Sequence, residues 1–368
     1  MHEAEFELEA VTPIFMRGAD QTKAEIRSTS IKGLMRWWFR ALAGNYFGND
    51  ITGLKKAEEF VFGSTNQKSK VDVEIAEISG KCKRLILKRI GKKCKIDESS
   101  PSNQLKYLWF SINLLAGNCK LDEYYPDRTR FTIRIKARDI HSFNVAVTSF
   151  WTLITLGSIG FRSRRGAGCL KFVGGDLNVL KELSLKWKMN DKNDLKNSIL
   201  TAIERIGLEL NSISTVIGLK SRLQKLEKLE PQPYPILNQR TSFVGLWDAK
   251  TGNPIEALKR FQKEYSGFRA SINKDIERKK LRIVFGSPLV IRKRIKEKWI
   301  TLFSEQRRRA SPIMIGISEV GHKRYLRVMM FRTKPYHPEI KDVNWKLIKD
   351  LGLKLGVYPI FGSLEVFG

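Results

Sequence analysis

Residues 157–168 read GSIGFRSRRGAG and combine the residue types that a phosphate-binding loop needs. Glycine permits positive φ and the close approach of another backbone, and arginine offers forked donors that match phosphate oxygens. No acid occurs from His141 to Gly175, so the loop has no nearby counter-ion in the sequence. The alternatives are an ordinary glycine turn after a helix and, for Phe161, a plug for the core instead of a stacking platform. The candidate ligands are Gly160, Phe161, Arg162, Arg164, Arg165, Gly166 and Gly168.

A second basic and aromatic group lies in RSTSIKGLMRWWFRALAGN at residues 27–45. Apolar side chains recur there at helical spacing, and the hydroxyls of residues 28–30 are typical of helix caps that leave N–H groups free for one phosphate. No acid occurs from Ile26 to Asn49. We expect a phosphate track with stacked bases, the alternative being a solvated helix face. The candidates are Lys32, Arg36 and Arg40 on one ridge, Trp37 off the centre of the apolar face, and Phe39 at its margin.

A third basic group is EQRRRASP at residues 305–312, directly before a predicted strand. Here Arg307, Arg308 and Arg309 are candidate phosphate ligands, and the neighbouring VIRKRIKEK is similarly basic. Both runs are also typical of a solvated surface.

Motifs for enzymatic chemistry are missing from the sequence. It contains no GxxxxGK[ST], HExxH or GxSxG, which excludes the common NTPase, zinc-peptidase and α/β-hydrolase signatures. The four histidines are scattered, and the four cysteines form no CxxC pair or zinc-ligand spacing. We therefore expect no catalytic residue, metal site or cofactor. The cysteines are interpreted as reduced, partly buried thiols, with a disulfide pair left open.

The charge balance points to a polyanionic partner. Lysine and arginine number 67 against 38 acids, a formal net charge of +29, and much of it falls in acid-free stretches. Nucleic acid is the partner that such a surplus favours, and the alternative is a solubilising surface. No signal peptide is predicted, and the uncharged run at residues 142–161 holds too many polar residues and glycines for a membrane span. We expect a cytoplasmic protein without a membrane partner.

The order of predicted elements defines the expected fold. In the first half we predict a strand near residues 5–10, helices at 28–45 and 55–62, strands at 71–78, 84–90, 107–115 and 130–140, a loop at 91–103, a helix at 143–156 and a strand at 168–173. In the second half we predict helices at 192–210, 255–272 and 344–356, a break at 230–235, and strands at 281–290, 310–320 and 324–332. The segments FVFGSTNQ and IVFGSPLV form a weak internal echo.

This order predicts the α+β class, with two ferredoxin-like (RRM-like) domains in which antiparallel sheets carry helices on one face. We divide the chain into residues 1–175, which include the glycine-rich loop, and residues 176–368, which include helical insertions.

Three segments together resemble the RAMP superfamily of CRISPR proteins. They are TPIFMRGADQTKAEIRSTSIKGLMRWWFRAL at residues 12–42, EEFVFGS at 58–64, and GSIGFRSRRGAGCLKF at 157–172, which is similar to the glycine-rich RAMP signature. FGSP and RRRASPIMIGIS resemble second-half landmarks of the family. The resemblance is closest to the subunits numbered first in the Cmr, or type III-B, effector complex.

The resemblance implies a non-catalytic subunit of an antiviral complex, with partners in single-stranded RNA and other Cmr subunits. Guide RNA, target RNA or both would be contacted near the 3′ end of the guide. Two alternatives stay open. One is a metal-dependent endoribonuclease centred on Asp20, which lies where a related backbone subunit carries an aspartate needed for cleavage. The other is a protein-assembly scaffold without intrinsic affinity for RNA.

Overall fold

The computed structural model describes residues 1–219, 223–272, 279–295, 298–334 and 343–368, with the side chains of residues 287–308 outside the description. Two four-stranded antiparallel sheets organise the described chain, in the orders β2-β7-β1-β8 and β12-β13-β9-β14. Each order places the first and third strands of its unit at the centre, which is the ferredoxin-like arrangement. The α+β class and the ferredoxin-like fold are therefore confirmed.

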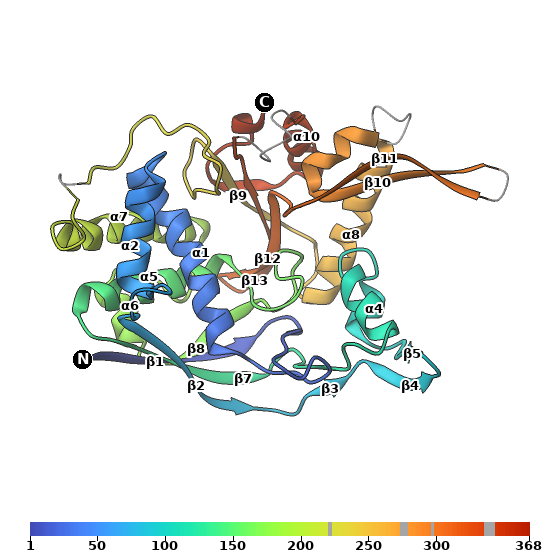
Figure 1. Cartoon of the computed structure of the whole chain (residues 1–368), viewed down its shortest axis with the longest axis horizontal. Coiled ribbons are helices and arrows are strands. Elements are labelled where there is room, and N and C mark those ends of the chain that lie inside the picture. The colour runs from blue at the N-terminus through green and yellow to red at the C-terminus, as the bar shows by residue number, and fades with distance from the viewer. Residues whose placement is uncertain (220–222, 273–278, 296–297, 335–342) are drawn as a thin grey trace.

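The first unit lies at the bottom of Figure 1, with helices above its sheet. Alternation in β1 buries Phe6 and Leu8 against the helices and leaves charged residues on the other face. Helix α5 is buried almost all round, as predicted for the long uncharged run. The elements are β1 (His2–Ala10), α1 (Ser28–Phe47), α2 (Ile51–Phe62), β2 (Val71–Ser79), β7 (Arg130–Ala137), α5 (Ile140–Leu156) and β8 (Leu170–Gly175).

Residues 83–124 form an insert between β2 and β7, and two predictions for it are wrong. The apolar run at 107–115 is a helix, because Trp109, Ile112 and Ala116 recur at helical spacing and are buried. The expected loop at 91–103 contains a strand and a helical turn. The elements are β3 (Lys83–Arg84), β4 (Ile86–Ile90), β5 (Lys93–Ile96), α3 (Pro101–Gln104), α4 (Phe110–Gly117) and β6 (Glu123–Tyr124).

A disulfide joins Cys94 in β5 to Cys119 after α4, so the expectation of reduced thiols is wrong for this pair. The strand and the loop that bring the two cysteines together are both absent from the predicted elements. Cys82 is free and half-buried, and Cys169 is free and buried, as expected.

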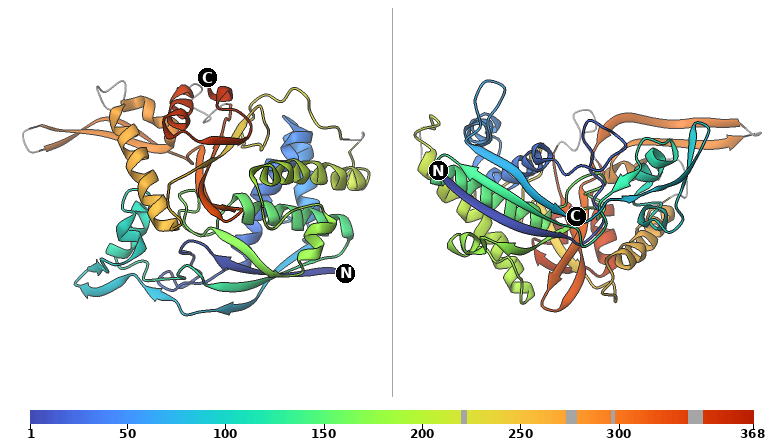
Figure 2. Two further views of the ribbon diagram at one scale, coloured as in Figure 1. Left: turned by 180° about the vertical axis from the view of Figure 1, so that it is seen from behind. Right: turned by 90° about the horizontal axis from the view of Figure 1, so that it is seen from below.

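The second unit follows two connecting helices, α6 (Leu177–Glu182) and α7 (Lys192–Ile213). Figure 2 shows its sheet standing above the first unit, with the hairpin β10–β11 extending away from the body. Its elements are β9 (Ser242–Trp247), α8 (Pro254–Ser271), the 3₁₀ turn η1 (Leu281–Phe285), β10 (Ser287–Ile295), β11 (Lys298–Arg309), β12 (Ile313–Val320), β13 (Lys323–Phe331), α10 (Lys346–Leu355), β14 (Tyr358–Phe361) and the 3₁₀ turn η2 (Leu364–Phe367).

The internal echo marks equivalent places in the two units. FVFGS ends α2 and IVFGS ends η1, and each segment turns at a glycine of positive φ, Gly63 at 79° and Gly286 at 119°. Phe62 and Phe285 are buried before these turns. The division at residue 175 stays a prediction, since α7 contributes buried residues to the core of the first unit and its Glu209 binds His141 of α5 at 2.8 Å.

Across the part of the chain that the structure describes, no helix is both long enough and apolar enough to span a bilayer.

Candidate nucleic-acid interface

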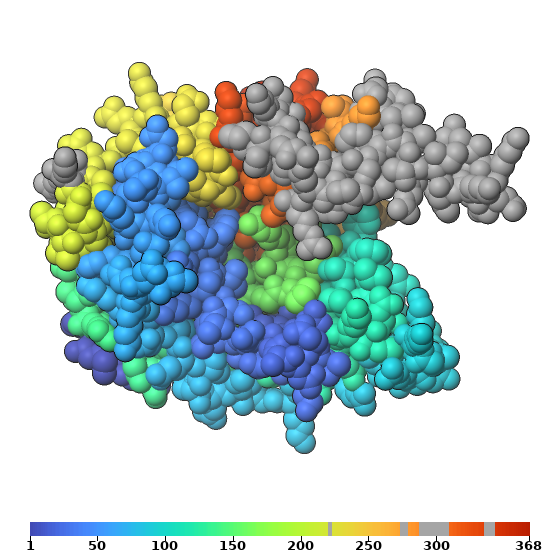
Figure 3. Space-filling view, in the orientation of Figure 1, coloured from blue at the N-terminus to red at the C-terminus, as the bar shows by residue number. Residues whose placement is uncertain are grey.

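A groove of about 530 Å³ opens where three segments of the first unit meet. The segments are the loop between β1 and α1, the first turns of α1, and the glycine-rich loop after α5. In Figure 3 they lie on one face, in dark blue, blue and green. The groove is lined by Met16, Arg17, Ser30, Gly33, Leu34, Gly160 and Phe161.

An arginine and an aromatic ring stack within this groove. The Arg17 guanidinium carbon lies 4.9 Å from the centroid of the Phe161 ring, and Phe161 is 36 % exposed, so part of this residue remains open to solvent. Arg17 is held in place because it also donates to the carbonyls of Gln21 at 3.1 Å and Lys120 at 2.6 Å. A cation beside a half-exposed ring is suited to a phosphate and its attached base.

The amino end of α1 faces the same groove. Its N-cap is Arg27, which makes no side-chain cap, so the predicted hydroxyl caps at residues 28–30 are wrong: these residues form the first helical turn. Ser30 and Gly33 line the groove, and nothing lies within 4 Å of the position that a Cβ at Gly33 would occupy. Because Ser30 belongs to the first helical turn, the positive end of the helix dipole lies beside the groove.

The signature glycines are needed for backbone packing. Gly160, Gly166 and Gly168 all have positive φ, as expected. The backbone that approaches them is the chain's own: a Cβ at Gly160 would lie 2.6 Å from the Phe15 carbonyl oxygen, and one at Gly168 would lie 2.0 Å from that of Ile159. These glycines shape the groove, and no bound phosphate is required to explain them.

The loop arginines connect the two units. Arg164 donates to the Ser311 carbonyl at 3.0 Å and Arg165 to the Ile313 carbonyl at 2.9 Å, while the Ile315 amide donates to the Arg164 carbonyl at 3.1 Å. The remaining arginine of the loop, Arg162, donates to the carbonyl of Leu108 in the insert at 2.8 Å. The loop therefore joins β12 to the first unit, a structural role that the sequence did not reveal.

These arginines form no ion pair with a carboxylate of the described residues. Burial, with a lesser contribution from Arg165, lowers the pKa of Arg162 to about 10. Burial, with lesser contributions from Arg309 and Arg165, likewise lowers the pKa of Arg164 to about 10. Positive charge is concentrated here at a cost in free energy, and a nearby anion would relieve that cost.

The ridge on α1 is partly neutralised, contrary to expectation, because two of its three cations share one carboxylate. Arg36 donates to Glu58 of α2 at 2.6 Å, and Arg40 reaches both oxygens of that carboxylate at 2.9 and 2.8 Å. The Glu58 side chain is only 7 % exposed. Lys32 donates to the Ser69 hydroxyl at 2.7 Å and the Val71 carbonyl at 2.5 Å, and burial lowers its pKa. The counter-ion that the sequence of α1 lacks is Glu58, which lies on the next helix.

The two aromatic candidates on α1 lie in different environments. Phe39 is fully buried against Phe62, so its predicted place at the margin is wrong, because α2 covers that side of the helix. Trp37 is half-buried, packs edge-on against Phe331 of β13, and lies 5.3 Å from the Arg164 guanidinium carbon. Trp37 therefore contacts the second unit.

The outer face of the first sheet carries ion pairs and is a poor surface for a polyanion. Alternate residues of β1 are glutamates, among them Glu5 and Glu9. Arg134 donates to Glu5 at 2.6 Å, and Glu9 binds Arg130 at 3.0 Å and Lys171 at 3.2 Å. The groove is the better candidate.

The third predicted group is described only in part. Arg307 and Arg308 lie at the end of β11, and their side chains fall outside the described residues. Arg309 donates to the Thr333 hydroxyl at 2.8 Å.

Sequence reasoning missed two residues that line the groove, Arg17 and Gly33, and one buried cation. For Arg17 the available signal was the turn at Gly18 after β1. Arg327 of β13 is 1 % exposed and donates to the carbonyls of Thr155 at 2.6 Å and Gly157 at 3.0 Å, which joins β13 to the end of α5.

Asp20 occupies an exposed turn. Its carboxylate accepts hydrogen bonds from the Thr22 hydroxyl at 2.7 Å and the Thr22 amide at 2.9 Å, and these bonds lower its pKa. Glu25 pairs with Arg27 at 3.6 Å. Within the described ranges, no three His, Cys, Asp or Glu side chains are grouped to hold a metal ion.

Comparisons with known proteins agree with the two-unit fold. The RAMP superfamily model matches residues 7–171, and the model of the Cmr1-like C-terminal domain matches residues 247–356. The CRISPR system Cmr subunit Cmr1-1 of Pyrococcus furiosus is 33 % identical over 98 % of each chain. The subunit Cmr1-2 of the same organism is 42 % identical over 193 residues, which are 50 % of this chain and all of that protein.

Solved structures show the same likeness. The crystal structure of Cmr1 from P. furiosus matches with a TM-score of 0.71 at 31 % identity, covering 98 % of this chain and 99 % of the other. A chain in the type III-B Cmr-beta structure bound to cognate target RNA matches with a TM-score of 0.60 over 96 % and 98 % of the two chains. At 16 % identity, this second match shows the fold alone.

Proposed function

Because the chain belongs to the Cmr1 family of the RAMP superfamily, we propose that it is a non-catalytic, RNA-binding subunit of a type III-B CRISPR (Cmr) complex. Its ligand is guide RNA, target RNA or both, near the 3′ end of the guide, and its protein partners are other Cmr subunits. Its relatives carry the name Cmr subunit, and a structure with the same fold belongs to a complex with target RNA.

The observation that carries the proposal is the groove in which Arg17 stacks on Phe161 beside the amino end of α1. One nucleotide fits this arrangement chemically: its base packs on the exposed face of the phenyl ring, and its phosphate meets the guanidinium and the first N–H groups of the helix. Recognition of this kind does not depend on sequence, because every base has a π face.

The loop arginines support the proposal indirectly. Arg162 and Arg164 are half-buried cations whose neighbours among the described side chains are other cations, aromatic rings and carbonyl groups. Their field adds to that of Arg17 and favours a polyanion in the groove. In this proposal Trp37 and Arg165 act by contacting the second unit. The ridge of Lys32, Arg36 and Arg40 adds to the positive potential around the groove.

The test fills the groove without disturbing the fold. Gly33→Leu places a side chain in open space on the exposed face of α1, and Gly267→Leu makes the same change in an exposed part of α8 that is also open. With a fluorescein-labelled oligouridylate of about 16 nucleotides, Gly33→Leu should raise the dissociation constant about tenfold, the equivalent of one lost base stack. Equal affinities of the two variants for the RNA would show that the groove is not part of the RNA interface.

The two other functions are separated by independent measurements. End-labelled RNA incubated with the protein and Mg²⁺ would show cuts that an Asp20→Asn variant abolishes if Asp20 were catalytic, yet no geometric observation favours that role. Assembly with partner subunits after nuclease treatment, together with no affinity for oligouridylate, would indicate a scaffold.

A further inference from the structure

The hairpin β4–β5 carries a dense positive charge that the groove does not use. From Ile78 to Ile96 the chain has no acid, and it holds eight lysines and arginines: Lys81, Lys83, Arg84, Lys88, Arg89, Lys92, Lys93 and Lys95. All eight are exposed. Among the described residues, ion pairs reach only two of them: Arg84 pairs with Asp122, and Lys95 lies 3.9 Å from an exposed Glu98.

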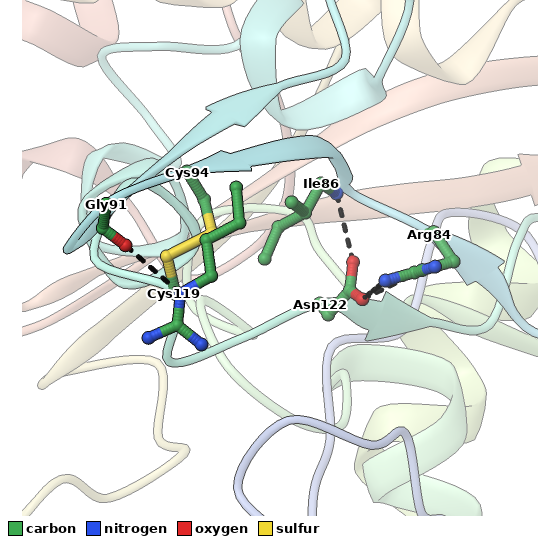
Figure 4. Close-up of a disulfide and its surroundings, with 7 residues drawn as sticks. Arg84, Ile86, Gly91, Cys94, Cys119 and Asp122 are labelled. Carbon is green, nitrogen blue, oxygen red and sulfur yellow. Dashed lines mark hydrogen bonds and ion pairs between the residues drawn. A yellow bond between two sulfur atoms is a disulfide. The ribbon is translucent and has the colours of Figure 1, made fainter.

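The hairpin is fixed to the rest of the insert at both ends, as Figure 4 shows. At its base, Asp122 accepts hydrogen bonds from the Ile86 amide at 3.0 Å and from the Arg84 guanidinium at 2.8 Å. Near its tip, the disulfide ties Cys94 to Cys119. A run of charged side chains that only faces solvent needs no disulfide, because its side chains do not have to be held in one place.

The cations on one face of the hairpin oppose each other. The register pairs Lys88 with Lys95 and Ile90 with Lys93, so three ammonium groups share one face of a two-stranded ribbon. Like charges directly opposite each other destabilise an antiparallel pair. An anion lying along that face would be attracted to all three ammonium groups and would offset the repulsion between them.

The hairpin is connected to the groove by short contacts. The Arg17 guanidinium, which stacks on Phe161, donates to the carbonyl of Lys120, the residue after the disulfide cysteine Cys119. On the other side of the insert, the indole of Trp109 donates to the carbonyl of Arg165 at 2.9 Å. A polymer leaving the groove past Arg17 therefore meets the insert that carries the hairpin.

We infer that the Lys88, Lys93 and Lys95 face of the β4–β5 hairpin is a second phosphate-binding surface, which holds the sugar–phosphate backbone of the RNA strand where it leaves the groove. This inference rests on the proposed function and adds to it a contact between lysine side chains and RNA phosphates that does not depend on the bases. The disulfide keeps the face in position relative to Arg17.

The test uses the full chain in its oxidised form with labelled oligouridylates of about 4 and about 16 nucleotides, the range over which single-strand sites extend. A triple Lys→Gln variant at positions 88, 93 and 95 is compared with a triple Lys→Gln control of equal charge at three exposed positions, Lys181 in α6, Lys196 in α7 and Lys188 between these helices. Figure 1 shows α6 and α7 at the side of the molecule away from β4 and β5. The hairpin variant keeps its stability, since it relieves repulsion.

With the longer RNA, the slope of log K against log salt should become shallower by about 2 in the hairpin variant, at about 0.7 for each lost phosphate contact, and should change little in the control. With the shorter RNA, which the groove alone holds, the two triple variants should bind alike. Equal slopes for the two variants with the longer RNA would overturn the inference while leaving the groove intact.

Two further outcomes identify which proposal fails. If the unsubstituted protein binds neither RNA, the proposed function fails and the hairpin inference fails with it. If the hairpin variant binds RNA normally but no longer assembles with nuclease-treated partner subunits, the face docks an acidic protein and the inference is wrong.

Discussion

Removal of the disulfide should loosen the insert without unfolding the two sheets. The double variant Cys94→Ser/Cys119→Ser opens a covalent loop whose ends are 25 residues apart. In the chain-entropy account, closing a loop of about 25 residues stabilises the folded state by about 3.5 kcal/mol at 25 °C. Since the hairpin and the 118–122 loop are peripheral to both sheets, this loss should appear as local opening.

Hydrogen exchange measured by mass spectrometry can locate that opening. A loss of about 3.5 kcal/mol corresponds to an increase of about 300-fold in the exchange rate of protected amides. The increase should be confined to peptides covering residues 83–97 and 115–122. Peptides from β1 and β7 should exchange as before, because the disulfide does not contact those strands.

The matched control is Cys82→Ser, which changes a free cysteine close to the insert. Exchange rates in the hairpin should be the same in this variant as in the unsubstituted protein. The reasoning is refuted if the double variant and the control exchange alike throughout the insert, or if the increase extends evenly over the first sheet.

Three other predictions concern stability. Glu58→Gln removes the shared carboxylate of two guanidinium groups, so urea denaturation should show a loss of about 1.5–3 kcal/mol, and a loss below about 0.5 kcal/mol would contradict the pairing. Gly168→Ala forces a Cβ to 2.0 Å from a carbonyl oxygen and should lower the thermal midpoint, whereas Gly33→Ala, in open space on a helix, should raise the free energy of unfolding by up to about 1 kcal/mol. A hydrogen bond from Lys323 holds the pKa of Asp248 below its usual value, so Asp248 makes its full contribution to the free energy of unfolding above about pH 4 and loses it as the pH falls further. The difference in stability between the unsubstituted protein and Asp248→Asn should therefore shrink on acidification. A difference that stays constant with pH would exclude this linkage.

Much of the fold follows from periodicity in the sequence. The alternation in β1 and the helical spacing in α1 and α7 predict these elements, because long segments bury one consistent face. The run at 107–115 was misassigned because short aromatic and apolar stretches fit a strand and a helix equally well. The central strand β9 was missed, although its residues SFVGLW are typical of a buried strand.

The candidate site was predictable in position but not in detail. The glycine signature correctly indicated close backbone approach at Gly160 and Gly168. At Gly168 the approaching backbone is Ile159 of the same loop, but at Gly160 it is Phe15, from a loop far earlier in the chain, which local spacing does not encode. Likewise, Glu58 pairs with Arg36 and Arg40 of a ridge that is free of acids in its own segment. Which acid pairs with Arg36 and Arg40 depends on how α2 packs on α1, and the spacing of residues along the chain does not reveal this packing.

The most direct test of RNA binding in the groove is ultraviolet crosslinking of RNA to the assembled complex, with the crosslinked residues located by mass spectrometry. We predict crosslinks in the peptides that contain Arg17 and Phe161, with fewer crosslinks after Gly33→Leu and no reduction after Gly267→Leu. Crosslinks confined to the outer face of the first sheet, or unchanged by Gly33→Leu, would contradict the account.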